Sequence, residues 1–332
     1  YIKHICDFEN FDGSDFYLAT EGRFSGETLI TSPQDVIKDI VATELNLPTQ
    51  DLDESFSAGN HAEFASLAFS VKDKIDSKKL IEEICTNTRL FPRMRKNKLG
   101  LVSINYTYPD NGQDIIIDYN KILNYKFSRT KIDDVKSKVM VKYNIDYATG
   151  EFKNNTGWFS AKDLFGDGET TTPYYNETYN GLGYRMGYFN LSVFETDTQL
   201  VFEAKYIKER TSAYKLQEFL TAWYCNQHTK ITVDLDISYL HLEVGDIIKF
   251  DRLINDVKAY GEDYTIQNFR NGQVIYPLFL IEEISKKTKK VTVTCTQLHK
   301  LEAEYEPHPE GGEILRRGRV DSVDMNYLIN YL

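Results

Sequence analysis

Apolar residues recur at helical spacing in three parts of this chain. The first part follows Ser32-Pro33-Gln34-Asp35, where the serine suits the N-cap and the proline suits the first helical position. A second amphipathic segment follows Asp76, and a third spans residues 212–225. The pattern therefore predicts helices that begin near residues 33, 77 and 212.

Alternation of apolar and other residues predicts β-strands between and after these helices. In residues 137–147, Val139, Val141 and Tyr143 alternate with residues that include Lys138 and Lys142, as in a strand with one buried face. The predicted strands cover residues 64–71, 100–108, 137–147, 188–194, 200–206, 231–237, 247–250, 274–284 and 290–297. Helices and strands are mixed along the chain, which predicts an α+β fold with antiparallel or mixed sheets.

A change of composition at residues 148–183 divides the chain. This stretch is rich in Gly, Asn and Thr, which predicts a long surface loop and a domain boundary. We predict two mixed α/β modules, at residues 1–147 and at 184–300, the second with an antiparallel sheet. A linker at 301–312 and a small C-terminal helical cap at 313–332 complete the predicted organisation. A length of 332 residues agrees with two or three domains.

The charge balance argues against one class of partner. The chain has 39 Lys and Arg against 50 Asp and Glu, so its net charge is −11, whereas tight binding to nucleic acid needs clustered cations. An acidic wall would still let DNA slide past, because it repels the phosphates. The 23 tyrosines and 19 phenylalanines fit either a broad contact surface or simply a strand-rich fold.

The positions of cysteine and histidine indicate neither a metal site nor a disulfide framework. The cysteines, which lie far apart and form no C-x-x-C pair, are Cys6, Cys85, Cys225 and Cys295. The histidines also lack metal-ligand spacing, and His228, shortly after a predicted helix, is expected to be a capping or surface residue. We therefore predict reduced thiols, no metal and no cofactor. No run of about 18 apolar residues occurs, so no membrane span is expected.

Known catalytic motifs are absent from the sequence. It contains no G-x-S-x-G, no H-E-x-x-H and no Gly-rich phosphate loop. Asp234 and Asp236 share the polar face of a predicted strand, where solvated carboxylates are the simpler interpretation. A glycosidase pair stays open as an alternative, because it needs only two carboxylates about 5 to 10 Å apart. We predict no catalytic residues, and hence that the protein is not an enzyme.

The end of the chain resembles half of a dockerin-type, EF-hand-like repeat. In residues 312–324, the glycine, the valine and the closing acidic residue of the repeat are matched by Gly318, Val320 and Asp324. Leu315 and Arg317, however, stand where the repeat needs oxygen ligands, and cationic side chains oppose calcium binding. The resemblance therefore implies a degenerate, metal-free cap that packs through a helix at 326–332.

The order of the predicted elements over residues 22–298 resembles the tail-tip and baseplate hub proteins of tailed phages. The segments that carry the resemblance are YLATEGR at 17–23, SPQDVIKDI at 32–40, KNKLGL at 96–101, SRTKI at 128–132, YKLQEFLTAWY at 214–224 and LEVGDII at 242–248. These motifs are hydrophobic and architectural. In such proteins this order of elements builds paired modules of the hub.

The resemblance implies a structural function in the virion tail, after assembly in the host cytoplasm. It implies a homotrimer that closes the tail tube around a lumen through which DNA passes during ejection. The implied partners are further copies of the chain, a tail-tube or distal tail protein, and tail fibre or spike proteins or a puncturing device. Proteins of this kind usually begin with a further domain that is not evident after Tyr1, so we expect part of the protein upstream.

Two other functions stay open at this stage. A Tyr-rich surface also suits a receptor-binding or adhesion module of the tail, which would contact carbohydrate or protein. A tail-associated glycan hydrolase or peptidase is the third alternative, although it has no support from a motif.

Overall fold

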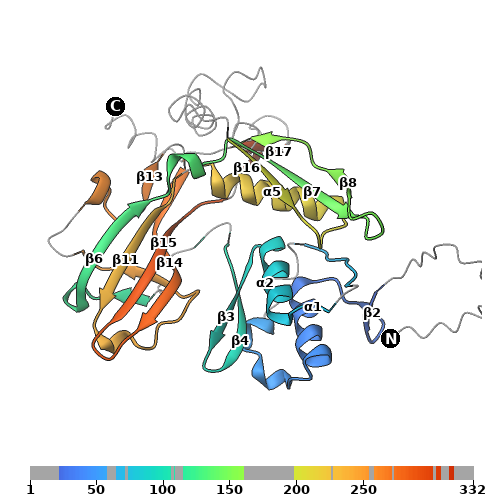
Figure 1. Ribbon diagram of the computed structural model, residues 1–332. Helices are drawn as coiled ribbons and strands as arrows, with labels where there is room; N and C mark the ends of the chain where they lie inside the picture. The colour runs from blue at the N-terminus through green and yellow to red at the C-terminus, as the bar shows by residue number, and fades with distance from the viewer. Residues whose placement is uncertain are drawn as a thin grey trace, which may run out of the picture.

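The computed structural model describes residues 22–57, 65–71, 74–105, 108, 115–160, 198–225, 227–253, 258–270, 273–301, 304–307 and 314–317. Figure 1 shows a large sheet on the left and a lobe with the helices α1 (Pro33–Asp39) and α2 (Ser77–Asn87) at the lower right. The helix α5 (Arg210–Tyr224) and a smaller sheet lie at the upper right, above the lobe and beside the upper end of the large sheet. Helices mix with antiparallel and mixed sheets, which confirms the predicted α+β class.

The helices begin close to the predicted positions. At the start of α1, the Ser32 side chain accepts a hydrogen bond from the Asp35 amide at 3.1 Å. At the start of α2, Asp76 accepts one from the Lys79 amide at 3.0 Å. A π-helical turn, Ile40–Glu44, extends α1. The cap predicted at Ser32 is therefore confirmed, and Asp76 caps the second helix in the same way.

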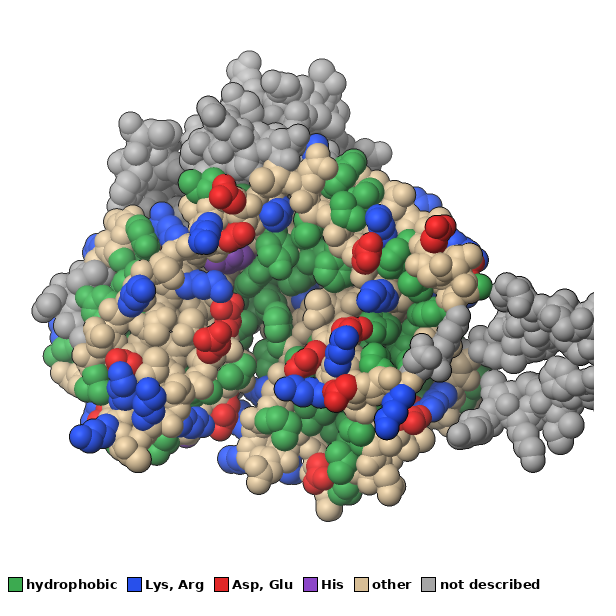
Figure 2. Space-filling model, viewed as in Figure 1, with side chains coloured by type: hydrophobic (Ala, Val, Ile, Leu, Met, Phe, Trp, Pro, Cys, Tyr) green, Lys and Arg blue, Asp and Glu red, His purple; other side chains and the backbone are tan. Residues whose placement is uncertain are grey.

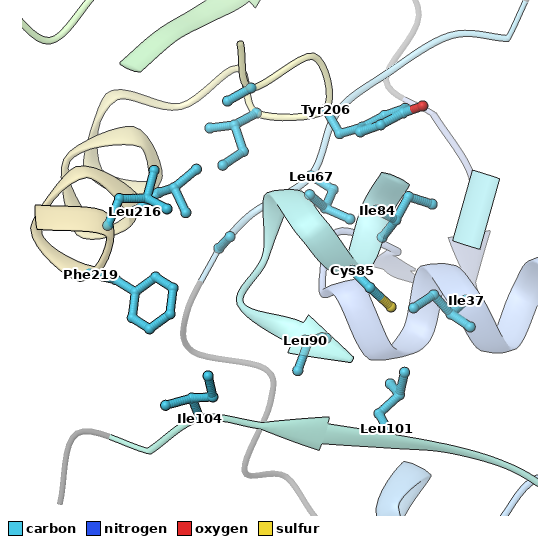
Figure 3. Close-up of a cluster of buried hydrophobic side chains, with 14 of the residues drawn as sticks. Ile37, Leu67, Ile84, Cys85, Leu90, Leu101, Ile104, Tyr206, Leu216 and Phe219 are labelled. Atoms are coloured by element: carbon cyan, nitrogen blue, oxygen red, sulfur yellow. The ribbon is translucent and has the colours of Figure 1, made fainter. Parts of the chain in front are cut away.

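One hydrophobic core connects the helical lobe to α5. Ile37 of α1, Ile84 and Cys85 of α2, and Leu216 and Phe219 of α5 belong to the same cluster of buried side chains (Figure 3). The predicted apolar face of α2, formed by Leu80, Ile81, Ile84 and Cys85, is buried. Because α5 shares this core, it belongs to the same packed body as the lobe.

The large sheet has seven strands. Its order is β5 (Ile115–Ile117), β12 (Ile247–Phe250), β14 (Gln273–Lys286), β15 (Val291–His299), β11 (Thr229–Leu235) and β6 (Ile122–Arg129), and β13 (Asn268–Arg270) also pairs with β14. Only the β5–β12 pair is parallel within this sheet. The alternation predicted for β11 and β15 is confirmed, because Ile231, Val233, Val291 and Val293 are all fully buried.

The smaller sheet packs against α5. Its order is β10 (Gln199–Glu203), β7 (Lys138–Ile145) and β8 (Phe152–Asn155), and β9 (Phe159–Ser160) also pairs with β7. β7 and β10 run parallel, with Val139 opposite Leu200. The Gln217 side chain of α5 donates a hydrogen bond to the Val139 carbonyl at 2.9 Å, so the helix is tied directly to the central strand.

Both sheets combine strands from both predicted modules. β5 and β6 precede residue 148, yet they pair with β12 and β11, which follow residue 198. In the smaller sheet, β7 also precedes residue 148 and pairs with β10, which follows residue 198. The predicted module boundaries stay a prediction, but within the described residues the pairing crosses the division at 148–183.

Several local predictions were wrong or incomplete. β8 and β9 lie inside the stretch expected to be a loop, whose residues 161–183 are outside the described residues. The strand predicted at 64–71 is reduced to a single bridge between Leu67 and Ile207. Its backbone amides donate hydrogen bonds to different segments and not to one neighbouring strand, so no ladder forms. The sequence patterns also did not predict β3 (Leu90–Arg95) or β6. The strand predicted at 188–194 falls outside the described residues.

The expected linker and cap contain a short hairpin. β16 (Glu304–Pro307) pairs antiparallel with β17 (Ile314–Arg317), and the register sets Glu304 opposite Arg317. Leu315 and Arg317, which the dockerin-type resemblance puts in a metal loop, are therefore strand residues. The remaining matched positions, from 318 to 324, and the predicted helix at 326–332 are outside the described residues. In the part of the chain that the structure describes, no helix is long and apolar enough to span a membrane.

Candidate functional site

The carboxylates that the sequence left open as a glycosidase pair have separate structural partners. Asp234 lies 2.6 Å from the Lys290 ammonium group and accepts a hydrogen bond from the Thr292 hydroxyl at 2.6 Å. These contacts hold the pKa of Asp234 below its ordinary value. Asp236 accepts a hydrogen bond from the Ser238 amide at 3.0 Å and so caps a short 3₁₀ turn. Both carboxylates therefore stabilise local structure.

The described residues contain no group of three or more metal-binding side chains. Cys85, Cys225 and Cys295 are free and buried, and burial raises the pKa of the Cys85 and Cys225 thiols to about 12. A buried, protonated thiol is a poor nucleophile. The most distinctive polar arrangement in this part of the chain is instead an ion network where the lobe meets the large sheet.

That network centres on a turn of the large sheet, residues 243–246. Asp246 lies 3.8 Å from Arg93 and 3.7 Å from Arg95, both on β3. Glu243 lies 2.8 Å from Lys286, the last residue of β14. The turn therefore connects two hairpins: β3 with β4 (Lys98–Ser103), and β14 with β15.

Arg93 extends the same network into the helical lobe. Its guanidinium group lies 3.3 Å from the carboxylate of Asp53, the N-cap residue of the 3₁₀ turn Glu54–Phe56. The side chains of Arg93, Asp53 and Asp246 are only 13%, 11% and 6% exposed. Charges so far removed from water depend on their partners, because an unpaired buried charge is strongly destabilising. Arg93 thus joins the lobe, the hairpin and the large sheet.

Close backbone packing supports the same junction. Gly245 has a φ of +87°, and a Cβ atom there would lie 2.4 Å from Cγ2 of Val102 on β4. Only glycine combines this backbone conformation with so short an approach. At Gly100, a Cβ atom would lie 2.1 Å from an Asp53 carboxylate oxygen. The β3–β4 hairpin is therefore in tight contact with both of its neighbours.

Beyond this junction, the hairpin ends in an exposed, basic turn. Lys96 and Asn97 have φ values of +49° and +62°, the left-handed pair that closes a two-residue hairpin. Lys96 and Lys98 are exposed, and the Met94 side chain is 62% exposed. Arg95 is partly exposed, with Asp246 beside it. The register pairs Arg95 with Lys98 and Met94 with Leu99, so the exposed Met94 side chain lies on the opposite face of the hairpin from these two cations.

The β14–β15 turn presents further cations. Lys286 and Lys290 pair with Glu243 and Asp234, whereas Lys287 and Lys289 are exposed and form no ion pair with residues that the structure describes. Figure 2 shows Lys and Arg side chains gathered at the lower left, where Figure 1 places this turn. The exposed cations of the two turns, which we call the basic face, are Lys96, Lys98, Lys287 and Lys289.

A separate feature is an apolar cavity of about 780 Å³ in the helical lobe. Apolar residues that line it include Leu29, Ile30, Val36, Ile40, Phe69 and Ile75. At its rim, Arg23 pairs with Asp39 at 2.6 Å and with Glu44. The apolar part of this lining suits binding of an apolar group.

Sequence reasoning did not find the basic face. The signals were present in RMRKNK at 93–98 and in KKTKK at 286–290, but the net charge of −11 conceals such local clusters. It also expected His228 to be a capping or surface residue, whereas the side chain is buried and contacts His299 at 2.8 Å. Both errors come from judging residues without their neighbours across the sheet.

Comparisons with known proteins give matches only among solved structures. No protein-family model matches the chain, and no curated protein matches it either. A chain of the virion of the native gene transfer agent particle has a TM-score of 0.47 and 9% identity; the match covers 85% of this chain and 50% of that one.

Two further matches are tail proteins. The tail protein from Neisseria meningitidis MC58 has a TM-score of 0.38 and 8% identity, with 80% of this chain and 66% of that chain covered. The 43 kDa tail protein of prophage MuSo2 from Shewanella oneidensis has a TM-score of 0.37 and 8% identity, with 82% and 66% covered. The chain thus spans between half and about two thirds of the length of these three structures.

Proposed function

We propose that this chain is a structural subunit of a phage tail, located in the virion at the tail tip or baseplate hub. The observation that carries the proposal is the junction built around Arg93. It joins the helical lobe, the β3–β4 hairpin and the large sheet through largely buried ion pairs. Such a network holds the parts of one body in a fixed relation, which a scaffold needs and a loosely connected binding module does not.

The order of elements supports the more specific part of the proposal. The helix that begins at residue 33, the hairpin turn within 96–101 and the turn at 242–248 lie in segments through which the sequence resembles hub proteins. As a hub, the chain would form a homotrimer that closes the tail tube and bears fibres, a spike or a puncturing device. Its negative net charge would let DNA pass through the lumen without tight binding.

Intact virions provide the test of location. Gold-labelled antibodies against the protein should mark the distal end of the tail, and averaging along the tail axis should place it with threefold symmetry. Mass photometry of the full-length protein should show trimers, and immobilised protein should retain tail-tube protein from a lysate of infected cells. Labelling elsewhere on the particle, or a protein absent from virions, would refute the proposal.

A receptor-binding module is a second candidate, because the apolar cavity beside α1 could accept part of a ligand. It predicts that the isolated protein binds host cells, and that substitution of Phe69 or Ile40 with a charged residue reduces binding. A glycan hydrolase would instead clear peptidoglycan in a zymogram. We expect neither result from a hub subunit, so the two assays separate the three functions.

A further inference from the structure

The cavity in the helical lobe leaves large apolar side chains in contact with water. Its walls come from β2 (Thr28–Leu29), α1 with the π-helical turn that extends it, residues 66–71 and the start of α2. Leu29 and Val71, which line it, are 36% and 46% exposed. A volume of about 780 Å³ lined in this way favours an apolar occupant, because burial of apolar surface is stabilising.

The chain enters the described part of the structure at the rim of this cavity. Gly22 is itself a lining residue, and a Cβ atom placed on it would lie 3.6 Å from Cδ1 of Leu29. Arg23 follows and pairs with Asp39 at 2.6 Å and with Glu44, so the chain lies against α1 and its π-helical extension at this point. The residues before Gly22 therefore start beside the cavity.

Three apolar side chains stand in a row shortly before this entry point. Phe16, Tyr17 and Leu18 precede Gly22 by four to six residues. An extended chain covers at most about 3.6 Å per residue, so their Cα atoms lie within roughly 14 to 22 Å of that of Gly22. A short tether of this kind gives an effective concentration of about 1 mM, so a weak apolar contact is enough for docking. A free partner would need a much higher affinity.

Charge at the rim also indicates what fits. Lys74 and Lys208 line the cavity and are exposed, and neither forms an ion pair with residues that the structure describes. Of the acids in the lining, two already pair with Arg23, and Glu209 accepts a hydrogen bond from the Ser212 hydroxyl at 3.2 Å. The rim therefore offers positive charge to an occupant.

We propose that Phe16, Tyr17 and Leu18 of the same chain pack into this cavity and close it as a strap. Residues 1–21 hold five acidic residues against one lysine, and Asp15 and Glu21 lie on either side of the apolar stretch, which matches the lysines at the rim. The strap would exclude other apolar groups, including those of a receptor, until it is displaced. This inference does not depend on the proposed hub function.

A disulfide trap tests where the strap lies. In the full chain with Cys6→Ser, the pair Leu18→Cys and Val71→Cys should form an intramolecular disulfide in oxidised glutathione. We expect it to form at least about fivefold faster than the pair Leu18→Cys and Leu240→Cys, because only the first pair is held together. Leu240 is a matched control, since it is 43% exposed and lies in the turn after β11. Peptide mapping under non-reducing conditions measures both rates.

Two results of the trap would overturn the inference. Equal rates for the two pairs would mean that the strap does not prefer the cavity. A covalent dimer formed through Leu18→Cys and Val71→Cys would mean that the cavity takes the segment of a neighbouring copy. The remaining described cysteines are buried, so they do not compete for the oxidant.

Thiol accessibility gives a second measurement that needs only one new cysteine. In the Cys6→Ser background, iodoacetamide should alkylate Leu18→Cys about tenfold more slowly than Ser14→Cys, because only the first side chain is shielded in the cavity. Rates in 6 M urea correct for differences in thiol reactivity, and circular dichroism checks that each variant is folded. Equal corrected rates at the two sites would contradict the strap.

Charge reversal at the rim tests the role of the lysines. Lys74→Glu with Lys208→Glu should speed the alkylation of Leu18→Cys by about threefold or more, because the rim then repels Asp15 and Glu21. The matched control is Lys96→Glu with Lys98→Glu, which makes the same charge change on the basic face and should leave the rate unchanged. The same rate in both double variants would refute the proposed charge match.

Discussion

His228 and His299 lie with their Nε2 atoms 2.8 Å apart, and both side chains are buried. His299 Nδ1 is 3.2 Å from the Lys300 carbonyl oxygen, which accepts hydrogen bonds and cannot donate one. This contact assigns the Nδ1 proton to His299 and leaves its Nε2 atom as an acceptor. His228 therefore donates from Nε2. Both rings contact Trp223 of α5, the His299 ring stacked and the His228 ring tilted.

Replacement of His299 should destabilise the protein. His299→Phe keeps an aromatic ring but leaves the buried Nε2–H of His228 without this acceptor, which costs about 1 to 3 kcal/mol. Urea unfolding followed by circular dichroism measures the loss. The exposed His241 is the control, and His241→Phe should change the free energy of unfolding by less than about 0.5 kcal/mol. Equal effects of the two substitutions would mean that the histidine pair contributes nothing specific.

Gly245→Ala should be among the most damaging single substitutions in the turn at 243–246. The new Cβ atom would have both an unfavourable φ of +87° and a contact of 2.4 Å with Val102. We expect a loss of about 2 kcal/mol or more in the free energy of unfolding. Gly150 is the matched control: its φ is +77° but a Cβ atom there meets nothing within 4 Å, so Gly150→Ala should cost only about 1 kcal/mol.

A double substitution separates the two contributions. Val102→Ala removes the methyl group that the new Cβ atom would meet, so Gly245→Ala should cost less in a Val102→Ala background than in wild type. If the cost is the same in both backgrounds, the contact between Gly245 and Val102 is not the cause. Calorimetric melting of the four proteins supplies the comparison.

Local patterns predicted much of this fold, and their failures have physical causes. Caps such as Ser32 and Asp76 fixed helix starts because they act on amides three residues away. Alternation found β11 and β15 because each has one buried face. β6 escaped detection, because most of its side chains are at least partly exposed and its place is set by pairing with β11.

The candidate site could not be predicted from local patterns, because its residues are distant from one another in the sequence. Asp53, Arg93 and Asp246 are far apart in the sequence, and only the fold brings them together. The pairing of β5 and β6 with strands after residue 198 is equally non-local. No spacing rule in a single sequence reports contacts of this kind.

Loss of the Arg93 side chain should weaken the junction. Arg93→Met leaves the mostly buried Asp53 and Asp246 carboxylates without their shared cation, and we expect a loss of about 2 to 3 kcal/mol. The value is moderated because Asp246 keeps Arg95 at 3.7 Å and Asp53 keeps the Ser55 amide at 2.8 Å.

An exposed ion pair provides the control for Arg93. Lys142 lies 3.6 Å from Glu203, with side chains 40% and 53% exposed, so Lys142→Met should cost less than about 1 kcal/mol. Limited proteolysis adds a local readout, since Arg93→Met should expose the β3–β4 hairpin to trypsin at Lys96 or Lys98. A variant as stable and as resistant as Lys142→Met would contradict the structural role given to Arg93.

The Asp234 carboxylate should make stability depend on pH in the acid range. Hydrogen bonds from Lys290 and Thr292 lower its pKa in the folded protein, so the folded state holds this proton less tightly than the unfolded state. The stabilisation is therefore complete above the ordinary aspartate pKa of about 4 and is lost as pH falls through the lowered value.

Asp234→Asn should cost about 1 kcal/mol at pH 7 and progressively less below about pH 4. Lys290→Gln should flatten the same acid limb, whereas Lys205→Gln, at an exposed site away from the pair, should follow wild type. Urea midpoints at pH 7, 4 and 3 measure these differences, and a constant difference between wild type and Asp234→Asn would refute the linkage.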